Sequence, residues 1–102
     1  MCYTTGVQFE LVFTFQAHEE LGRIQGHDPK QYKKIAHCLA TLEQDPRYPG
    51  LQSHPYETFD EVYGQKVWES YVENNTPSAW RIWWAYGPNR GQITVLTIGP
   101  HP

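Results

Sequence analysis

Residues 66–102, KVWESYVENNTPSAWRIWWAYGPNRGQITVLTIGPHP, decide the fold of this chain. They divide into three runs rich in aromatic and β-branched residues, 66–73, 79–87 and 92–99. Such residues are typical of β-strands, and the Asn, Pro and Gly clusters at 74–77 and 87–91 are typical of tight turns. The stretch therefore predicts an antiparallel meander of three strands.

Two polar residues of this stretch point to chemistry. Arg81 lies within the most aromatic run, and His101 follows the last run. Alternation along residues 79–87 predicts that Trp80, Ile82, Trp84 and Tyr86 face the core, and that Arg81, Trp83 and Ala85 share an open, concave face. A cation in a sheet beside a titratable group at a strand end is a layout that phosphoryl transfer or RNA cleavage would use.

The remaining residues predict one strand and two helices. Residues 7–15 alternate apolar and polar side chains, which indicates a strand with one buried face. Residues 16–24 predict a short helix, and Asp28 with Pro29 predicts the start of a second one over 30–44. Its apolar stripe is expected to be Tyr32, Ile35, Ala36, Leu39 and Leu42.

Residues 51–64 are polar, aromatic and rich in turn formers, which predicts a long loop with a strand fragment. The expected order is β-α-α-β-β-β. This is an α+β fold in which two helices pack on one face of a mainly antiparallel, four-stranded sheet. At 102 residues the chain is expected to form a single domain over 1–102.

Composition restricts the classes of function. The net charge is −3, which argues against a protein that grips nucleic acid over a wide surface. Five bases oppose nine acids before Val62, but three bases oppose two acids from Val62 onward, so an anionic partner would prefer the strand-rich end. Cys2 and Cys38 form no zinc spacing or disulfide framework, and we expect no metal and no cofactor. Neither a signal peptide nor a membrane span is evident, which predicts a cytoplasmic protein.

The order and spacing of several segments resemble the RelE/YoeB-like superfamily of bacterial toxin ribonucleases. The resemblance covers nearly the whole chain. Its single motifs are weak, and its strength is their order. The matching segments are VQFELVFTFQAHEEL (7–21), LEQDPRYPGLQSHP (42–55), KVWESYV (66–72), AWRIWWAYG (79–87) and TVLTIGPHP (94–102).

The resemblance implies a toxin that an antitoxin protein neutralises and that cuts mRNA at the ribosome without a metal; other members of the fold act on DNA gyrase. Arg81 matches the family's strand arginine, and His101 matches the catalytic histidine that YoeB-like members place after their last strand. Three features depart from the family. Tyr48-Pro49-Gly50-Leu51 stands where a glutamate is usual, Pro102 replaces a tyrosine, and Lys66 alone stands where RelE-like members have paired lysines. The general base is therefore open.

The residues themselves suggest roles for a metal-free RNA cleavage. Arg81 would hold the phosphate, and His101 would be the acid, whereas His54 and Glu69 compete as the base. The plainer alternatives are an ion pair of Arg81 with Glu69 or Glu73, a terminal histidine without contacts, a loop histidine at position 54, and a solvated Glu69. The expected RNA contacts, each with a plainer role at the surface or in packing, are Lys66, Trp83, Arg90, Arg47 and Tyr56.

Three functional classes follow. The first is a toxin that cleaves mRNA, is associated with the ribosome and is bound by an antitoxin. The second is a non-catalytic, ParE-like toxin of the same fold, and the third is a non-toxic binding module. A homodimer and a toxin–antitoxin hetero-oligomer both remain open as assemblies.

Overall fold

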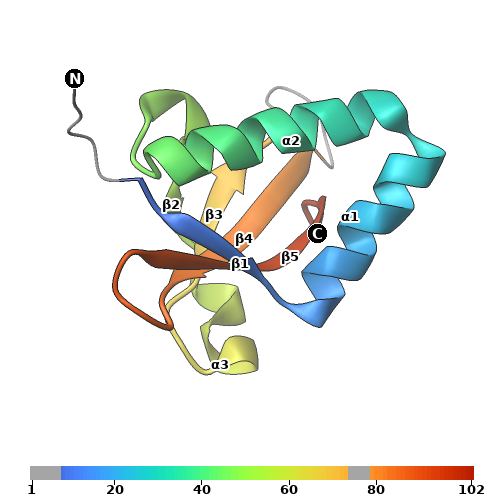
Figure 1. Cartoon of the computed structure of the whole chain (residues 1–102). Coiled ribbons are helices and arrows are strands. Elements are labelled where there is room, and N and C mark those ends of the chain that lie inside the picture. The colour runs from blue at the N-terminus through green and yellow to red at the C-terminus, as the bar shows by residue number, and fades with distance from the viewer. Residues whose placement is uncertain (1–7, 74–78) are drawn as a thin grey trace, which may run out of the picture.

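A five-stranded mixed sheet forms the centre of the part of the chain that the structure describes, residues 8–73 and 79–102, in a computed structural model (Figure 1). The strand order is β1-β5-β4-β3-β2. The strands are β1 (Glu10–Phe13), β2 (His54–Pro55), β3 (Trp68–Tyr71), β4 (Trp80–Tyr86) and β5 (Gln92–Pro100).

The predicted meander is confirmed. β3 pairs with β4 and β4 pairs with β5, both antiparallel, and β1 adds to β5 in parallel. The turn expected at 74–77 falls outside the described residues. The expectation of four strands is wrong, because the fragment His54–Pro55 pairs with β3 as a fifth strand. Its ladder of two residues is too short to show a period of two in the sequence.

The first strand is shorter than expected because a helix begins early. Thr14 caps α1 (Phe15–His27), with its hydroxyl accepting a hydrogen bond from the Ala17 amide at 3.0 Å. Phe15, predicted to be in the strand, is therefore the first helical residue and is largely exposed. Val7 lies outside the described residues.

The second helix, α2 (Pro29–Gln44), matches the prediction closely. Its buried residues are Gln31, Ile35, Cys38, Leu39 and Leu42. Ala36, expected in this stripe, is exposed. Cys38 lies one turn from Ile35 and Leu42 and takes that place in the stripe. No helix in the described part of the chain is long and apolar enough to cross a membrane.

Asp28 is predicted to stabilise α2 through its cap. Its Oδ1 accepts a hydrogen bond from the Gln31 amide at 3.2 Å. Asp28→Ala should lower the free energy of unfolding by about 1 kcal/mol, measured by urea denaturation. Asp28→Asn, which keeps an accepting oxygen, should stay close to wild type. Equal stability of the alanine variant and the wild type would contradict the cap.

Helices cover both faces of the sheet, which differs from the prediction of two helices on one face. α1 and α2 pack on one side, whereas the 3-10 turn η2 (Glu57–Phe59) and the short helix α3 (Asp60–Tyr63) cover the other (Figure 1). The core cluster under η2 and α3 consists of Val67, Trp83, Ala85 and Leu96, with Tyr56, Phe59 and Tyr63 packed against it. A helix of four residues has too few positions to show a helical period, so the sequence does not reveal α3.

A side chain from α1 occupies part of one sheet edge. β1 pairs with residues 92–95 of β5 and leaves the rest of that strand edge uncovered. Glu20 Oε1 accepts hydrogen bonds from the Ile98 amide at 2.8 Å and from the Thr97 hydroxyl at 2.9 Å. The carboxylate thus satisfies a strand donor that has no neighbouring strand.

Candidate functional site

Strand register brings the candidate residues to one face of the sheet. Glu69 and Tyr71 lie on the same face of β3, because alternate residues of a strand share a face. Pairing places His54 of β2 opposite Glu69 and Arg81 of β4 opposite Tyr71. Gly99 of β5 lies opposite Arg81, so the chain after β5 returns His101 to the same neighbourhood. Alternation along β3 is the sequence signal that would have found Tyr71.

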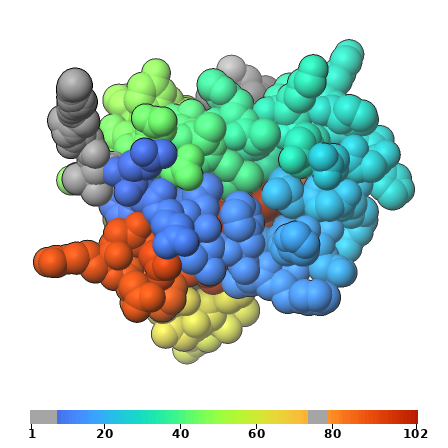
Figure 2. All heavy atoms as spheres, in the orientation of Figure 1, coloured from blue at the N-terminus to red at the C-terminus, as the bar shows by residue number. Residues whose placement is uncertain are grey.

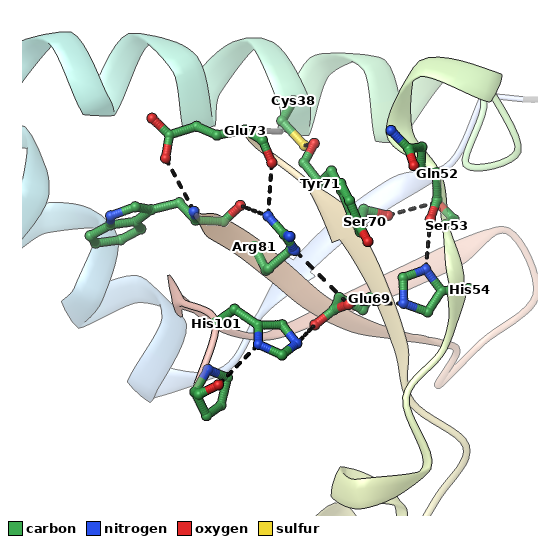
Figure 3. Close-up of polar contacts among 12 residues, drawn as sticks. Cys38, Gln52, Ser53, His54, Glu69, Ser70, Tyr71, Glu73, Arg81 and His101 are labelled. Atoms are coloured by element: carbon green, nitrogen blue, oxygen red, sulfur yellow. Dashed lines mark hydrogen bonds and ion pairs between the residues drawn. The ribbon is translucent and has the colours of Figure 1, made fainter. Parts of the chain in front are cut away.

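A single buried carboxylate connects two histidines. Glu69 has a side chain that is only 2% exposed. His54 Nε2 lies 2.9 Å from its Oε1, and His101 Nε2 lies 3.4 Å from its Oε2 (Figure 3). The alternative of a solvated Glu69 is therefore wrong. A buried carboxylate needs such partners to offset the cost of its desolvation.

Both histidines are partly open to solvent and have acceptors at both ring nitrogens. The side chains of His54 and His101 are 42% and 37% exposed. His54 Nδ1 lies 2.8 Å from the Gln52 carbonyl oxygen, and His101 Nδ1 lies 3.0 Å from the Pro102 oxygen. A neutral imidazole donates from one nitrogen only. A ring can therefore donate to the oxygens at both of its nitrogens only when both nitrogens carry a hydrogen.

Arg81 lies behind this carboxylate and is enclosed. Its NH1 donates to the carbonyl oxygens of Glu73 at 2.8 Å and Trp80 at 3.1 Å. Its guanidinium carbon lies 3.7 Å from the centre of the Tyr71 ring, and its Nε lies 4.0 Å from Glu69 Oε1. The ion pair with Glu69 is thus present. The expectation of an open face around Arg81 is wrong, because Tyr71 and two backbone carbonyls surround the guanidinium.

His101 is held by backbone and ring contacts. Its amide donates to the Ala79 carbonyl oxygen at 3.0 Å, which extends the pairing beside β4. The Tyr56 ring meets its imidazole edge-on at 5.8 Å between centroids. The alternative of a terminal histidine without contacts is therefore wrong. Tyr56, predicted as an RNA contact, instead packs between His101 and Trp83.

Trp83 does not offer a stacking surface. It is 3% exposed and packs against Tyr56 and Phe59, at 5.9 and 5.3 Å between ring centroids. The prediction of an open Trp83 is wrong because η2 and α3 cover this part of the face, and the sequence does not reveal them.

The three remaining cations lie outside the cluster of His54, Glu69, Arg81 and His101. Arg90 is carried by the turn between β4 and β5, at the opposite end of β4 from Arg81, and this turn projects from the protein (orange, Figure 2). Arg47 follows α2, and Lys66 Nζ lies 5.1 Å from the centre of the Trp68 ring. All three are exposed.

Glu73 makes hydrogen bonds to Trp80 and Arg81 at the start of β4. The Trp80 amide, 3.1 Å from Glu73 Oε1, lowers the pKa of this carboxyl; partial burial works against that effect, and Lys34 at 3.0 Å adds to it. The predicted ion pair of Arg81 with Glu73 is replaced by the bond to the Glu73 carbonyl oxygen.

Burial raises the pKa of Cys38 to about 12, so its thiol is a poor nucleophile. Among the described residues, no group of three or more His, Cys, Asp or Glu side chains could hold a metal ion.

Solved structures share this architecture, whereas no family model and no curated protein matches the chain. A YoeB/ParE toxin from Agrobacterium tumefaciens superimposes with a TM-score of 0.71 at 14% identity, covering 92% of this chain and 100% of that one. A YoeB–YefM complex from Staphylococcus aureus gives 0.67 at 14% identity, covering 93% and 99%. An archaeal RelE–RelB complex from Pyrococcus horikoshii OT3 gives 0.64 at 13% identity, covering 91% and 94%.

These matches span almost all of each chain, although the sequences differ at most positions. They bear out the fold class that the sequence predicts, an α+β fold with a largely antiparallel sheet. The chain has the fold of the RelE/YoeB-like toxins.

Proposed function

We propose that this chain, acting as one domain, is the toxin of a type II toxin–antitoxin pair and cleaves mRNA as a metal-free endoribonuclease. The observation that carries this proposal is the pair of partly exposed imidazoles, His54 and His101, held on the two oxygens of buried Glu69. Two histidines at one phosphate can supply a base and an acid in the same step. The fold shared with YoeB and RelE toxins supports the choice of RNA as the substrate.

His54 acts as the base and His101 as the acid. His54 takes the proton of a ribose 2′-hydroxyl, and that oxygen attacks the adjacent phosphorus. The bond from phosphorus to the 5′-oxygen breaks, and His101 gives this oxygen its proton. The products are a 2′,3′-cyclic phosphate and a free 5′-hydroxyl. Nδ1 of each ring lies at a backbone oxygen in the structure, and it must leave that contact to exchange a proton with RNA.

Glu69 is a positioning residue in this scheme. Its side chain is 2% exposed, and a histidine stands at each of its oxygens, so it does not meet a 2′-hydroxyl directly. It fixes the orientation of both rings and stabilises the imidazolium form of either one. His54 is therefore preferred over Glu69 as the base.

Arg81 stabilises the charge that grows on the phosphate through its field rather than as a two-pronged clamp. NH1 already donates to two backbone oxygens, but the positive charge of the guanidinium remains beside the cluster. Lys66, Arg47 and Arg90, all exposed, are proposed to contact the RNA backbone outside the cluster.

The proposed partners are an antitoxin protein, mRNA and the ribosome. YoeB of Staphylococcus aureus and RelE of Pyrococcus horikoshii were solved with YefM and RelB. A protein that covers His54 and His101 would stop cleavage, since both imidazoles are reached only from the surface. We propose that the antitoxin of this chain acts in that way, within a toxin–antitoxin hetero-oligomer.

The proposal is tested by inducing expression of the wild type, Arg81→Ala and His101→Ala while following growth and transcript integrity together. The wild type should arrest growth and cut transcripts, and each variant should abolish both. Arrest with intact transcripts would indicate a ParE-like toxin with another target. A folded wild type that does neither would leave only a binding module of this fold.

A further inference from the structure

A hollow of about 350 Å³ opens on the face of the sheet opposite the cluster of His54, Glu69, Arg81 and His101, near the edge strand β2. Its aromatic lining consists of Tyr48, Trp68, Trp84 and Tyr86, and Arg47 and Ser53 join them. We propose that this hollow binds a nucleobase of single-stranded RNA on the 5′ side of the cleaved bond. The inference rests on the proposed RNA cleavage and adds to it a binding site that belongs to the chain itself.

The rings are arranged for stacking. Tyr48 and Tyr86 are 53% and 45% exposed, so both rings can be reached from solvent. Trp84 is buried beneath them. Trp68 stacks on Trp84 at 5.9 Å, and Tyr86 meets Trp84 edge-on at 5.0 Å. A base that enters the hollow would contact the exposed tyrosine rings above the buried Trp84. Base–aromatic stacking tolerates any base.

Tyr48 is held in place by the absence of a side chain at Gly50. A Cβ atom added at Gly50 would lie 2.8 Å from Cε2 of the Tyr48 ring, closer than such atoms approach. The ring therefore rests over the glycine backbone. This packing restricts the Tyr48 ring although the ring is exposed to solvent. A ligand that stacks on it therefore loses little binding free energy to ordering of the side chain.

Charge at the rim matches a nucleotide rather than an apolar side chain. Burial raises the pKa of Tyr86, and the charge of nearby Arg47 lowers it, whereas Asp45 raises it. Arg47 and Tyr86 both line the hollow. Lys66 Nζ lies 5.1 Å from the centre of the Trp68 ring. Aromatic walls with two exposed cations offer contacts to a base and to the phosphates that flank it.

The path of the chain sets the polarity of the bound RNA. Gln52 and Ser53 line the hollow and directly precede His54. The Ser53 hydroxyl donates to the Pro46 carbonyl oxygen at 2.8 Å and lies 2.7 Å from the Ser70 hydroxyl. These contacts join the segment that lines the hollow to strand β3. His54 serves the ribose on the 5′ side of the cut, and His101 serves the leaving group. A hollow reached past His54 therefore takes an upstream nucleotide.

The experiment measures binding of a short, fluorescently labelled 2′-O-methyl oligoadenylate, which cannot be cleaved, by fluorescence anisotropy with the full chain. Tyr48→Ala should raise Kd about tenfold, the loss expected for one stacked base. Gly50→Ala, which displaces the ring without removing it, should weaken binding in the same direction, and Tyr48→Phe should not. Phe15→Ala is the matched control, because Phe15 is an exposed aromatic outside the hollow. Circular dichroism and melting confirm that each variant is folded.

The outcomes separate this inference from the proposed function. If the folded Tyr48→Ala and Gly50→Ala variants bind RNA as Phe15→Ala does, the hollow is not an RNA site, and a peptide becomes its expected occupant. If binding depends on Tyr48 but the wild type cleaves no RNA, the nuclease proposal fails and the hollow stands. If the wild type does not bind the oligoadenylate at all, the inference is overturned.

Discussion

Glu69→Ala is expected to abolish RNA cleavage and to lower the free energy of unfolding by about 3–5 kcal/mol, the range for breaking a buried ion pair. The alanine leaves Arg81 beside an empty space and removes the carboxylate that lies beside both imidazoles. Because the lost carboxylate is buried, water does not replace these contacts at low cost. Urea denaturation followed by circular dichroism gives the stability, and a fluorescent oligonucleotide gives the cleavage rate.

Glu69→Gln separates the charge of this group from its shape. The amide oxygen can accept from one imidazole, while the amide nitrogen donates to the other in its neutral form. We expect this variant to keep most of the stability but to cleave about 100-fold more slowly, since neither ring is then stabilised as an imidazolium. Nitrogen NMR of the His54 and His101 rings reports their protonation without requiring activity. Wild-type cleavage and unchanged ring signals in Glu69→Gln would remove the proposed role.

His54→Ala and His101→Ala are each expected to slow cleavage about 100- to 10,000-fold. Each should also lower the free energy of unfolding, because it removes a partner of buried Glu69. The double variant should lose less than the product of the two effects, because groups that act in one step are not additive. His18→Ala and His37→Ala are matched controls, since both are exposed histidines on the helices. The readout is the rate of cyclic phosphate formation with each purified variant.

A substrate with sulfur in place of the leaving 5′-oxygen distinguishes the two roles. A thiolate leaves without being protonated, so this substrate should restore cleavage by His101→Ala but not by His54→Ala. The reverse pattern would exchange the acid and the base. Equal rescue of both variants, or of neither, would contradict a division of labour between them.

The sequence predicts most of the sheet because residues 66–102 carry strong, repeated signals for strand and turn. Arg81 is singled out as a charge within an aromatic strand, and His101 as a histidine directly after the last strand. The cap at Asp28 can also be predicted from the sequence, because capping is a local interaction between neighbours in the chain.

Features that depend on contacts between distant segments are not predicted. The sharing of Glu69 by His54 and His101 joins residues from β2, β3 and the segment after β5, and no spacing in the chain encodes it. Trp83 has the strand alternation of an open-face residue, but η2 and α3 cover it. Local periodicity therefore gives the face on which a side chain lies, and tertiary packing decides whether that face is open.

The carboxylate that Glu20 places along β5 affects how this protein associates with others. It occupies the Ile98 amide, a donor that an added strand would need. At the opposite edge, β2 is only two residues long and contains Pro55, which has no amide hydrogen. The uncovered part of β5 and the edge at β2 are thus poor templates for strand addition, which limits aggregation at both places. We expect an inhibitory partner to bind over a face of the molecule rather than to add a strand at either of them.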